Sequence, residues 1–232
     1  MDERTFDDFD AFANDYRTVH TENVKFSGAD SFYFAEMKVK LLLQYEKNAA
    51  LTVLDIGCGD GATALFMEEH FPQWRVCGID ISAKSIEVAK ARRLTNTTFQ
   101  TYDGKAIPFP AENFDVIFIA GVLHHVNFML HKGLVNEIVR VMKKEGRLYL
   151  FEHNPLNPLT RYLVKTCIFD KDAKLLRNGY TTALLKKTGL KIESNRFIIF
   201  FPRKGILSKL IFLEKYLQWL PLGGQYFIKA CK

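Results

Sequence analysis

From residue 51 onward, short apolar segments alternate with amphipathic segments, and this alternation constrains the fold more than any other feature of the chain. The apolar segments are rich in Val, Ile, Leu, Tyr and Phe, as strands buried on both faces of a parallel sheet are. Between them, apolar residues recur every three or four positions, which is typical of helices that cover a sheet. The pattern predicts βαβ units. The expected strands are 51–56, 75–81, 97–103, 114–121 and 147–153, and the expected helices are 62–71, 83–93 and 134–144.

Beyond residue 155 the alternation is less regular. It predicts a helix near 180–188, a strand at 191–201, a helical stretch near 205–220 and a last strand at 225–231, so two late strands extend the edge of the same sheet. The first 50 residues lack strand patterning, and segments 6–16 and 33–47 are typical of helices that could close over the sheet's carboxyl edge. Ser82 and Ser85 suit a helix start and Gly146 suits a helix end.

Composition narrows the class of protein. The chain has 232 residues, 25% of them charged and 48% hydrophobic, which is typical of a globular protein with a full core. The acidic first twenty residues contain no secretory signal, and no run of 18 apolar residues occurs, so we expect a cytoplasmic protein. The four cysteines are too far apart for a zinc pair or a redox CxxC motif, and we expect reduced thiols.

The segment VLDIGCGDG (53–61) ends an expected strand at Asp55 and places three glycines before an expected helix. Glycines there permit a tight turn and the close approach of a ligand to the backbone. Asp80 and Asp103 end the next two strands, at the edge where ligands of doubly wound sheets bind. Asp55 suits an ammonium group, Asp80 a ribose and Asp103 a purine amino group, whereas Asp55 and Asp60 would repel phosphate. S-adenosylmethionine carries all three groups, a sulfonium and no phosphate.

On these residues the chain resembles the class I S-adenosylmethionine-dependent methyltransferases. It is similar in particular to the group that includes the ubiquinone and menaquinone biosynthesis methyltransferases. The resemblance covers residues 50–155, through VLDIGCGDG, GIDIS, the stretch 103–126 and GRLYLFEHNP. It implies an α/β fold with a doubly wound, Rossmann-like seven-stranded sheet, an antiparallel last strand and helices on both faces. It also implies methyl transfer from S-adenosyl-L-methionine, with S-adenosyl-L-homocysteine as the product.

The resemblance further implies where the cofactor binds. In the family the glycine loop lies against the methionine moiety, the second-strand acid binds the ribose, and the acid before IPFP lies at the adenine. The implied cofactor contacts are Asp55, Gly57, Cys58, Gly59, Asp80, Ile81, Asp103, Gly104 and Ala120. Two alternatives stay open, because Asp80 could cap a helix and Asp103–Gly104 is a common turn pair. We expect one domain over 1–232: a helical lid (1–50), a cofactor-binding core (51–155) and an acceptor-side region with the edge strands (156–232).

Four ionisable side chains follow the fourth and fifth strands and are the candidate catalytic residues, namely His124, His125, Glu152 and His153. A histidine with a pKa near neutral could remove a proton from a hydroxyl or an activated carbon. One histidine could instead only pack the loop, and transfer from a sulfonium to an aligned acceptor needs little further help. The remaining histidines lack motif context and are expected at the surface; they are His20, His70 and His131.

Absences narrow the acceptor. The segment after the fourth strand has neither an Asn/Asp-Pro-Pro-Tyr/Phe motif nor a Pro-Cys pair, so we expect no nucleic-acid partner. The sequence has no cluster of acidic residues that would bind a metal ion to chelate the acceptor, so we expect no metal. A small-molecule, lipid-linked or glycolipid acceptor remains. The alternatives are an NAD-dependent reductase, which Ala62 in place of a third glycine disfavours, and a non-catalytic adenosylmethionine-binding accessory protein.

The net positive charge of the chain comes from its C-terminal part. Residues 1–150 carry 17 Lys and Arg against 21 Asp and Glu, whereas residues 151–232 carry 15 against 5. The segment 203–224 combines lysines with Ile, Leu and Trp residues. It suits an amphipathic helix packed on the sheet or, alternatively, a surface that contacts an anionic membrane or a lipid acceptor.

Overall fold

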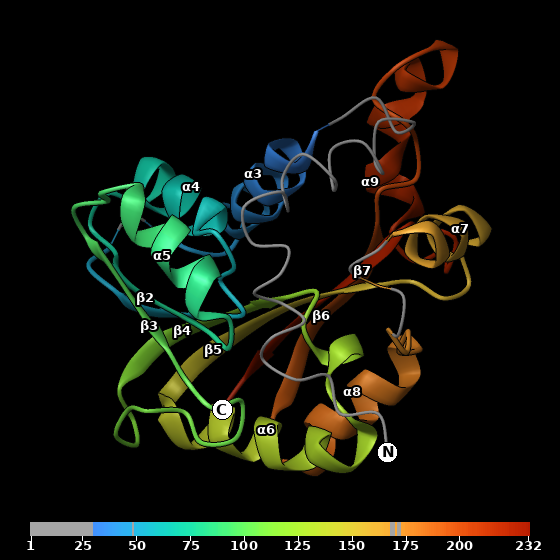
Figure 1. The fold of residues 1–232 in the computed structure, drawn as a ribbon. Coiled ribbons are helices and arrows are strands. Elements are labelled where there is room, and N and C mark those ends of the chain that lie inside the picture. Colours follow the sequence, from blue (N-terminus) through green and yellow to red (C-terminus); the bar gives the residue numbers. More distant parts are fainter. Residues whose placement is uncertain (1–29, 48, 168–169, 171–172) are drawn as a thin grey trace.

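The apolar segments form one mixed sheet in the computed structural model, which describes residues 30–47, 49–167, 170 and 173–232 (Figure 1). Seven strands of this part of the chain have the order β3-β2-β1-β4-β5-β7-β6. β7 is antiparallel to both of its neighbours, and the other strand pairs are parallel. The predicted fold class is confirmed. The strands are β1 (Thr52–Ile56), β2 (Arg75–Asp80), β3 (Thr97–Thr101), β4 (Phe114–Ala120), β5 (Met142–His153), β6 (Lys191–Ile198) and β7 (Gln225–Cys231).

The central strands are apolar on both faces because helices cover both. Successive side chains of a strand point to opposite faces. In β1, accordingly, Val53 belongs to one buried cluster and Leu54 to the other, and in β5 Tyr149 and Leu150 divide in the same way. The first cluster lies against α3 (Ser31–Leu42), α4 (Ala62–His70) and α5 (Ala83–Ala91), and the second against α6 (Phe128–Val141) and α8 (Asn178–Lys187) (Figure 1).

Local signals fix where the helices begin. Ser82 caps α5, since its hydroxyl accepts the Ser85 N–H at 3.0 Å, as the sequence predicts. The Asn127 side chain caps α6 in the same way by accepting the Met129 N–H at 3.0 Å. A proline at the start of α7 (Pro158–Thr166) fits the first helical turn, because a backbone N–H at that position would have no intrahelical acceptor. These caps place helix N-termini beside the carboxyl ends of the parallel strands.

Three sequence-based boundaries are wrong. The helix expected at 134–144 is α6, which begins at Phe128 and ends at Val141, and β5 follows at once. Gly146 therefore lies inside a strand and not at a helix end. A Cβ there would lie 2.8 Å from the Lys143 carbonyl oxygen, so glycine is needed for a tight backbone approach within β5. β3 ends at Thr101, which leaves Asp103 in the turn beyond the strand.

The C-terminal segment does not pack as expected. It contains the 3₁₀-helix η4 (Ile206–Leu213) and the short α9 (Glu214–Leu217), and neither has a buried residue. The segment rises away from the sheet (Figure 1). The expectation of an amphipathic helix packed on the sheet is therefore wrong, because no residue of η4 or α9 is buried. The large apolar residues that are exposed here are Ile206, Leu207, Phe212, Tyr216, Trp219 and Leu222.

The N-terminal expectations are tested in part. Segment 6–16 lies outside the described residues, whereas the helix expected at 33–47 is α3, which packs beside α4 with the Phe32 and Phe66 rings 6.3 Å apart. A lid role for 1–50 stays a prediction. In the described part of the chain, no helix has the length and hydrophobicity needed to cross a membrane.

The structure also corrects one expectation about the isolated histidines. His131 is fully buried, with Nδ1 2.8 Å from the Tyr180 hydroxyl and Nε2 3.0 Å from the Leu123 carbonyl oxygen, so its surface placement is wrong. His70 is partly buried, and His20 lies outside the described residues. All four cysteines are free thiols, and two of them, Cys58 and Cys167, are buried.

Candidate functional site

The glycine loop between β1 and α4 is the first part of the site. Gly57, Gly59 and Gly61 all have positive φ angles, of 71°, 53° and 77°, which favour glycine. A Cβ at Gly57 would lie 2.3 Å from a Val122 methyl carbon, whereas one at Gly59 would meet nothing within 4 Å. The Gly57 and Cys58 N–H groups donate to the Ile79 carbonyl at 2.8 and 3.1 Å. The loop is therefore fastened to β2 while the backbone at Gly59 stays open to a ligand.

Asp80, at the end of β2, braces this loop. Its Oδ2 accepts the Gly59 N–H at 2.9 Å, and its Oδ1 accepts the Ser82 N–H at 2.9 Å. The carboxylate thus orients the glycine loop and the start of α5 together. A structural role is present whether or not a ribose also binds, and the ribose contact stays a prediction.

Asp55, at the end of β1, is the acid of this site whose carboxylate has the fewest compensating partners. It is 2% exposed, and among the described residues its Oδ2 has no hydrogen-bond partner. Burial, followed by the charge of Asp80, raises its pKa to about 7, against a weaker opposing effect of Lys38. A buried oxygen of this kind is suited to a cationic hydrogen-bond donor supplied by a ligand.

Asp60 does not act as the sequence suggests. Arg92 pairs with its Oδ2 at 2.5 Å and donates to its backbone carbonyl, so its charge is compensated within the fold. Repulsion of phosphate at this loop therefore depends on Asp55 and Asp80 and not on Asp60. The expectation that Asp60 repels phosphate is therefore wrong.

The predicted adenine end is only partly assembled. Ile81 and Gly104 do lie together, because a Cβ at Gly104 would be 3.3 Å from the Ile81 Cγ2 atom. Asp103 is exposed, and its Oδ1 accepts the Lys105 and Ala106 N–H groups at 2.8 and 3.0 Å. These bonds lower the pKa of Asp103 and give it the turn-forming role that the sequence left open.

Two further residues implied as cofactor contacts lie close to this part of the site. Cys58 is buried in the glycine loop, where burial raises its thiol pKa well above the usual range. Ala120 ends β4, the other strand that pairs with β1. Both are near the carboxyl edge of the sheet, and their cofactor contacts stay predictions.

The candidate catalytic residues come together on the other side of β1. The 3₁₀-helix η2 (Leu123–His125) follows β4, and Glu152 and His153 end β5. Glu152 Oε2 lies 2.5 Å from His124 Nδ1, and its Oε1 accepts the Leu123 N–H at 2.8 Å. The His124 ring centroid is 4.2 Å from that of His125 and 5.2 Å from that of His153. The four predicted residues therefore form one cluster.

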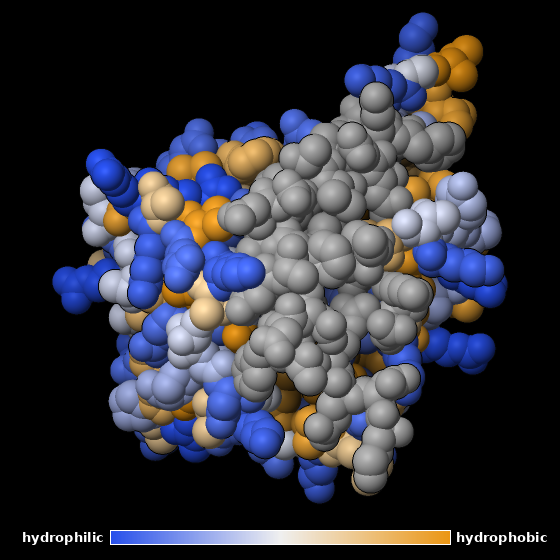
Figure 2. Space-filling model, in the orientation of Figure 1, coloured by the Kyte–Doolittle hydropathy of each residue, from blue (hydrophilic) through white to orange (hydrophobic). Residues whose placement is uncertain are grey.

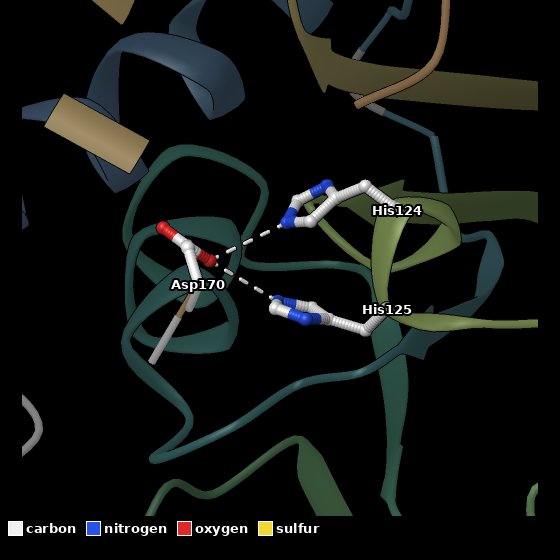
Figure 3. Close-up of side chains that lie close together, drawn as sticks. All are labelled: His124, His125 and Asp170. Atoms are coloured by element: carbon white, nitrogen blue, oxygen red, sulfur yellow. Dashed lines mark ion pairs between the residues drawn. The ribbon is translucent and has the colours of Figure 1, made fainter. Parts of the chain in front are cut away.

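Asp170 is a member of this cluster that sequence reasoning missed. Its Oδ1 lies 3.6 Å from His124 Nε2 and 3.3 Å from His125 Nε2 (Figure 3). It also lines a hollow of about 570 Å³ beside α7, together with Pro155, Arg161, Tyr162 and Lys165. The only available signal was an acidic residue in the irregular stretch after α7, which no motif distinguishes.

Charges within the cluster divide the histidines. Burial alone would lower the pKa of His124, but Glu152 and Asp170 raise it to about 10. Burial and then the charge of His124 lower the pKa of His153 to about 4, and the same two causes lower that of His125. Burial would raise the pKa of both carboxyl groups, yet the histidines hold those of Glu152 and Asp170 below their usual range. His124 thus binds a proton between two carboxylates, and its neighbours are neutral.

Comparisons with known proteins find methyltransferases. A family model described as a methyltransferase domain matches residues 53–146. An uncharacterized methyltransferase of Bacillus subtilis is 33% identical over 112 residues, which cover 47% of this chain and 43% of that protein. A demethylmenaquinone methyltransferase of Thermotoga maritima is 33% identical over 105 residues, or 45% of this chain and 44% of that protein. The matches therefore span less than half the length of these two relatives.

Longer matches are more distant. An uncharacterized protein of Methanocaldococcus jannaschii is 28% identical over 197 residues, which cover 84% of this chain and 79% of that protein. Among solved structures, an S-adenosylmethionine-dependent methyltransferase from Thermotoga maritima has a TM-score of 0.69 and 17% identity, covering 98% of this chain and all of that one. A chain from the complex of the Haloferax volcanii Trm112 methyltransferase activator with a methyltransferase has a TM-score of 0.70, 18% identity and 96% coverage of both chains.

The structural matches show the fold, and the family model spans the glycine loop and η2 but ends before Glu152 and His153. The cofactor of this family is S-adenosyl-L-methionine, which leaves as S-adenosyl-L-homocysteine. Residues 53–146 match the model of a methyltransferase domain, and the seven-stranded sheet makes the chain similar in fold to the class I S-adenosylmethionine-dependent methyltransferases.

Proposed function

We propose that this chain transfers a methyl group from S-adenosyl-L-methionine to a small or lipid-linked acceptor. The observation that carries the proposal is the buried Asp55 Oδ2, which no described residue satisfies and which lies beside a loop with open backbone at Gly59. An α-ammonium group supplies the positive charge and the N–H donors that this oxygen requires. A dinucleotide would instead bring phosphate charge to a buried acid, which opposes the NAD-dependent reductase alternative.

The residues present fit the rest of the cofactor. Asp80 is held by two backbone N–H groups with its carboxylate at the end of β2, where ribose hydroxyls would donate to it. Ile81 and Gly104, which lie in contact range of each other, would flank the adenine, with Asp103 at its amino group. Gly57, Cys58 and Ala120 would line the methionine moiety. The cofactor itself supplies the electrophilic methyl group, and these residues bind and orient it.

Calorimetry tests the cofactor assignment. S-adenosylmethionine and S-adenosylhomocysteine should bind, and NAD should not. Asp80→Asn should lose a charge-assisted hydrogen bond, which lowers the affinity by about 1.5–3 kcal/mol. Asp115→Asn is the matched control, because Asp115 is a carboxylate held by Thr52 and Lys143 near the start of β4, at the opposite end of the strands. Detectable NAD binding without adenosylmethionine binding would refute the assignment.

The acceptor side is the cluster of His124, His125, Glu152 and His153. We expect these residues to orient the acceptor beside the methyl group, with a histidine receiving the proton that the acceptor loses. Once an acceptor is known, alanine variants of the three histidines should be compared at saturating cofactor. At least one should lose about 10²-fold or more in turnover, the range for general acid–base catalysis. Full turnover in all three would leave alignment as the mechanism, and cofactor binding without turnover on any acceptor would favour an accessory protein.

The protruding segment 203–224 favours contact with a lipid surface as the route to a lipid-linked acceptor. Its exposed apolar side chains include Phe212 and Trp219, and three exposed lysines lie in the same segment. Figure 2 shows hydrophobic and hydrophilic residues beside each other on the projecting part of the molecule at the upper right. Apolar insertion and attraction to anionic headgroups act together in interfacial binding. The lysines are Lys204, Lys209 and Lys215.

Vesicle sedimentation tests this contact. Anionic vesicles should pellet the protein at low salt and less at high salt, and Trp219 fluorescence should shift to the blue. Lys204→Glu/Lys209→Glu should weaken the effect, whereas Lys186→Glu/Lys187→Glu, in the last turn of α8, should not. No sedimentation at low salt would mean that the basic face is only solvated.

A further inference from the structure

Where the histidine cluster lies beside the hollow, two histidine rings approach one carboxylate oxygen. A role in proton transfer does not require this arrangement. His124 and His125 are adjacent in η2, yet both direct Nε2 toward the same oxygen, Asp170 Oδ1, at 3.6 and 3.3 Å (Figure 3). One donor atom from each of the three residues lies within 4.8 Å of the others. Two donors bound to one tetrahedral zinc ion, each at about 2.0–2.2 Å, lie roughly 3.3–3.5 Å apart. The two nitrogen–oxygen separations are thus close to those that a shared ion imposes.

We propose that His124, His125 and Asp170 bind a divalent first-row transition metal ion. Two imidazole nitrogens and one carboxylate oxygen form the donor set of open catalytic zinc sites and of non-haem iron sites, in which the remaining positions take water or substrate. This inference differs from the sequence-based expectation of no metal, because the sequence did not connect Asp170 with the histidines.

Glu152 has the position of an outer carboxylate in such a site. Its Oε2 lies 2.5 Å from His124 Nδ1, and its Oε1 is held by the Leu123 N–H, so both of its oxygens are engaged. A carboxylate on one ring nitrogen fixes the histidine tautomer and leaves the other nitrogen as a metal ligand. The ring nitrogen opposite this contact is the Nε2 that faces Asp170.

The charge of the cluster also suits a dication. Glu152 and Asp170 place two carboxylates around His124, whose side chain is 1% exposed, as is that of Glu152. A protonated His124 compensates one of these charges. A divalent ion bound by neutral histidines compensates both, and buried charge is costly unless it is compensated.

Asp170 links this position to the hollow beside α7, because it is the member of the cluster that lines the hollow. An open coordination position on that side would meet an acceptor there. On the proposed function, a hydroxyl bound to the ion would lose its proton more readily and become the better nucleophile, which favours O-methylation. Metal binding itself does not depend on that step.

The test measures metal binding directly. The purified chain is stripped with a chelator, and Zn²⁺ and Co²⁺ are then titrated by calorimetry and visible absorption. We expect one equivalent per chain, Co²⁺ absorption typical of a nitrogen and oxygen site of low coordination number, and a rise in melting temperature. Glu152→Gln should weaken binding by about 10–100-fold. His125→Ala removes a ligand and Asp170→Asn replaces the carboxylate with a weaker, neutral amide oxygen, so both should weaken it further.

His70→Ala is the matched control, because His70 is in α4 and outside the cluster, so it should bind like the parent chain. Sub-stoichiometric binding by the parent, or equal binding by Asp170→Asn, would overturn the proposal. The parent Co²⁺ spectrum needs no variant and decides the question even if a variant does not fold. Metal binding without methyl transfer would count against the proposed function and not against the metal site, so the two failures are distinguishable.

Discussion

Replacing Asp55 with asparagine should stabilise the cofactor-free protein and weaken cofactor binding. The side chain is 2% exposed, its Oδ2 has no partner among the described residues, and burial followed by Asp80 raises its pKa to about 7. Asparagine has nearly the shape of the protonated acid and does not ionise. The variant therefore removes a buried charge without opening a cavity.

The size of the effect depends on pH, and its sign follows from proton linkage. The folded state holds the Asp55 proton up to about pH 7, whereas an unfolded chain releases it near pH 3.8. Stability from this group is fully present below pH 3.8, declines as pH rises through that interval and is lost above about pH 7. At about 1.4 kcal/mol for each tenfold difference in proton affinity, the loss over this interval is slightly more than about 4 kcal/mol. Asp55→Asn should recover much of it at about pH 8 and little at about pH 4.

Denaturant unfolding of the cofactor-free chain at several pH values measures this difference. Asp115→Asn is the control of opposite sign, because Lys143 and Thr52 hold the pKa of Asp115 below its usual value despite partial burial. That variant should be destabilised near neutral pH and should approach the parent chain in acid. A free-energy difference for Asp55→Asn that does not grow between about pH 4 and pH 8 would refute the claim that an uncompensated carboxylate lies at the end of β1.

Three further outcomes follow. The affinity of the parent chain for S-adenosylmethionine should fall as pH drops below about 7, by up to tenfold per pH unit, because Asp55 must lose its proton to pair with the ammonium group. Calorimetry in buffers of different ionisation enthalpy would detect the proton that is released. Gly57→Ala should lower the melting temperature and abolish cofactor binding, since its Cβ would lie 2.3 Å from a Val122 methyl carbon at a positive φ angle. Glu46→Ala should cost about 3–5 kcal/mol in denaturant unfolding, because it strips Arg147 and the buried Tyr149 hydroxyl of their shared carboxylate.

The sheet was predictable because its determinants are local. Each central strand is a run of apolar residues that divides between two buried clusters, and Gly61 and Ser82 mark helix starts within a few residues of strand ends. The boundary error at Gly146 arose because glycine also suits a strand in which backbone atoms approach closely. That contact, with the Lys143 carbonyl, is three residues away but depends on how β5 pairs with β4.

The site was predictable only where one strand end supplies the chemistry. Asp55, Asp80, His124 and Glu152 were found because each directly follows or ends an apolar run. Asp170 was not, because a stretch that enters the cluster from beyond α7 carries no periodic signal. The compensation of Asp60 by Arg92 was missed for the same reason, since the two residues meet only through the packing of α4 and α5. Pairings between distant segments are set by tertiary structure.

The two halves of the site lie on either side of one position in the sheet. β1 pairs with β2 on one side and with β4 on the other, so the chain's winding reverses between β1 and β4, and such a switch point opens a crevice at the carboxyl ends. Asp55 and Asp80 belong to the β1–β2 side, and the histidine cluster belongs to the β4–β5 side. On the proposed function, the cofactor would bind on the first side and the acceptor on the second. The sheet would then hold the methyl donor and the acceptor side by side, and such alignment supplies much of the catalysis.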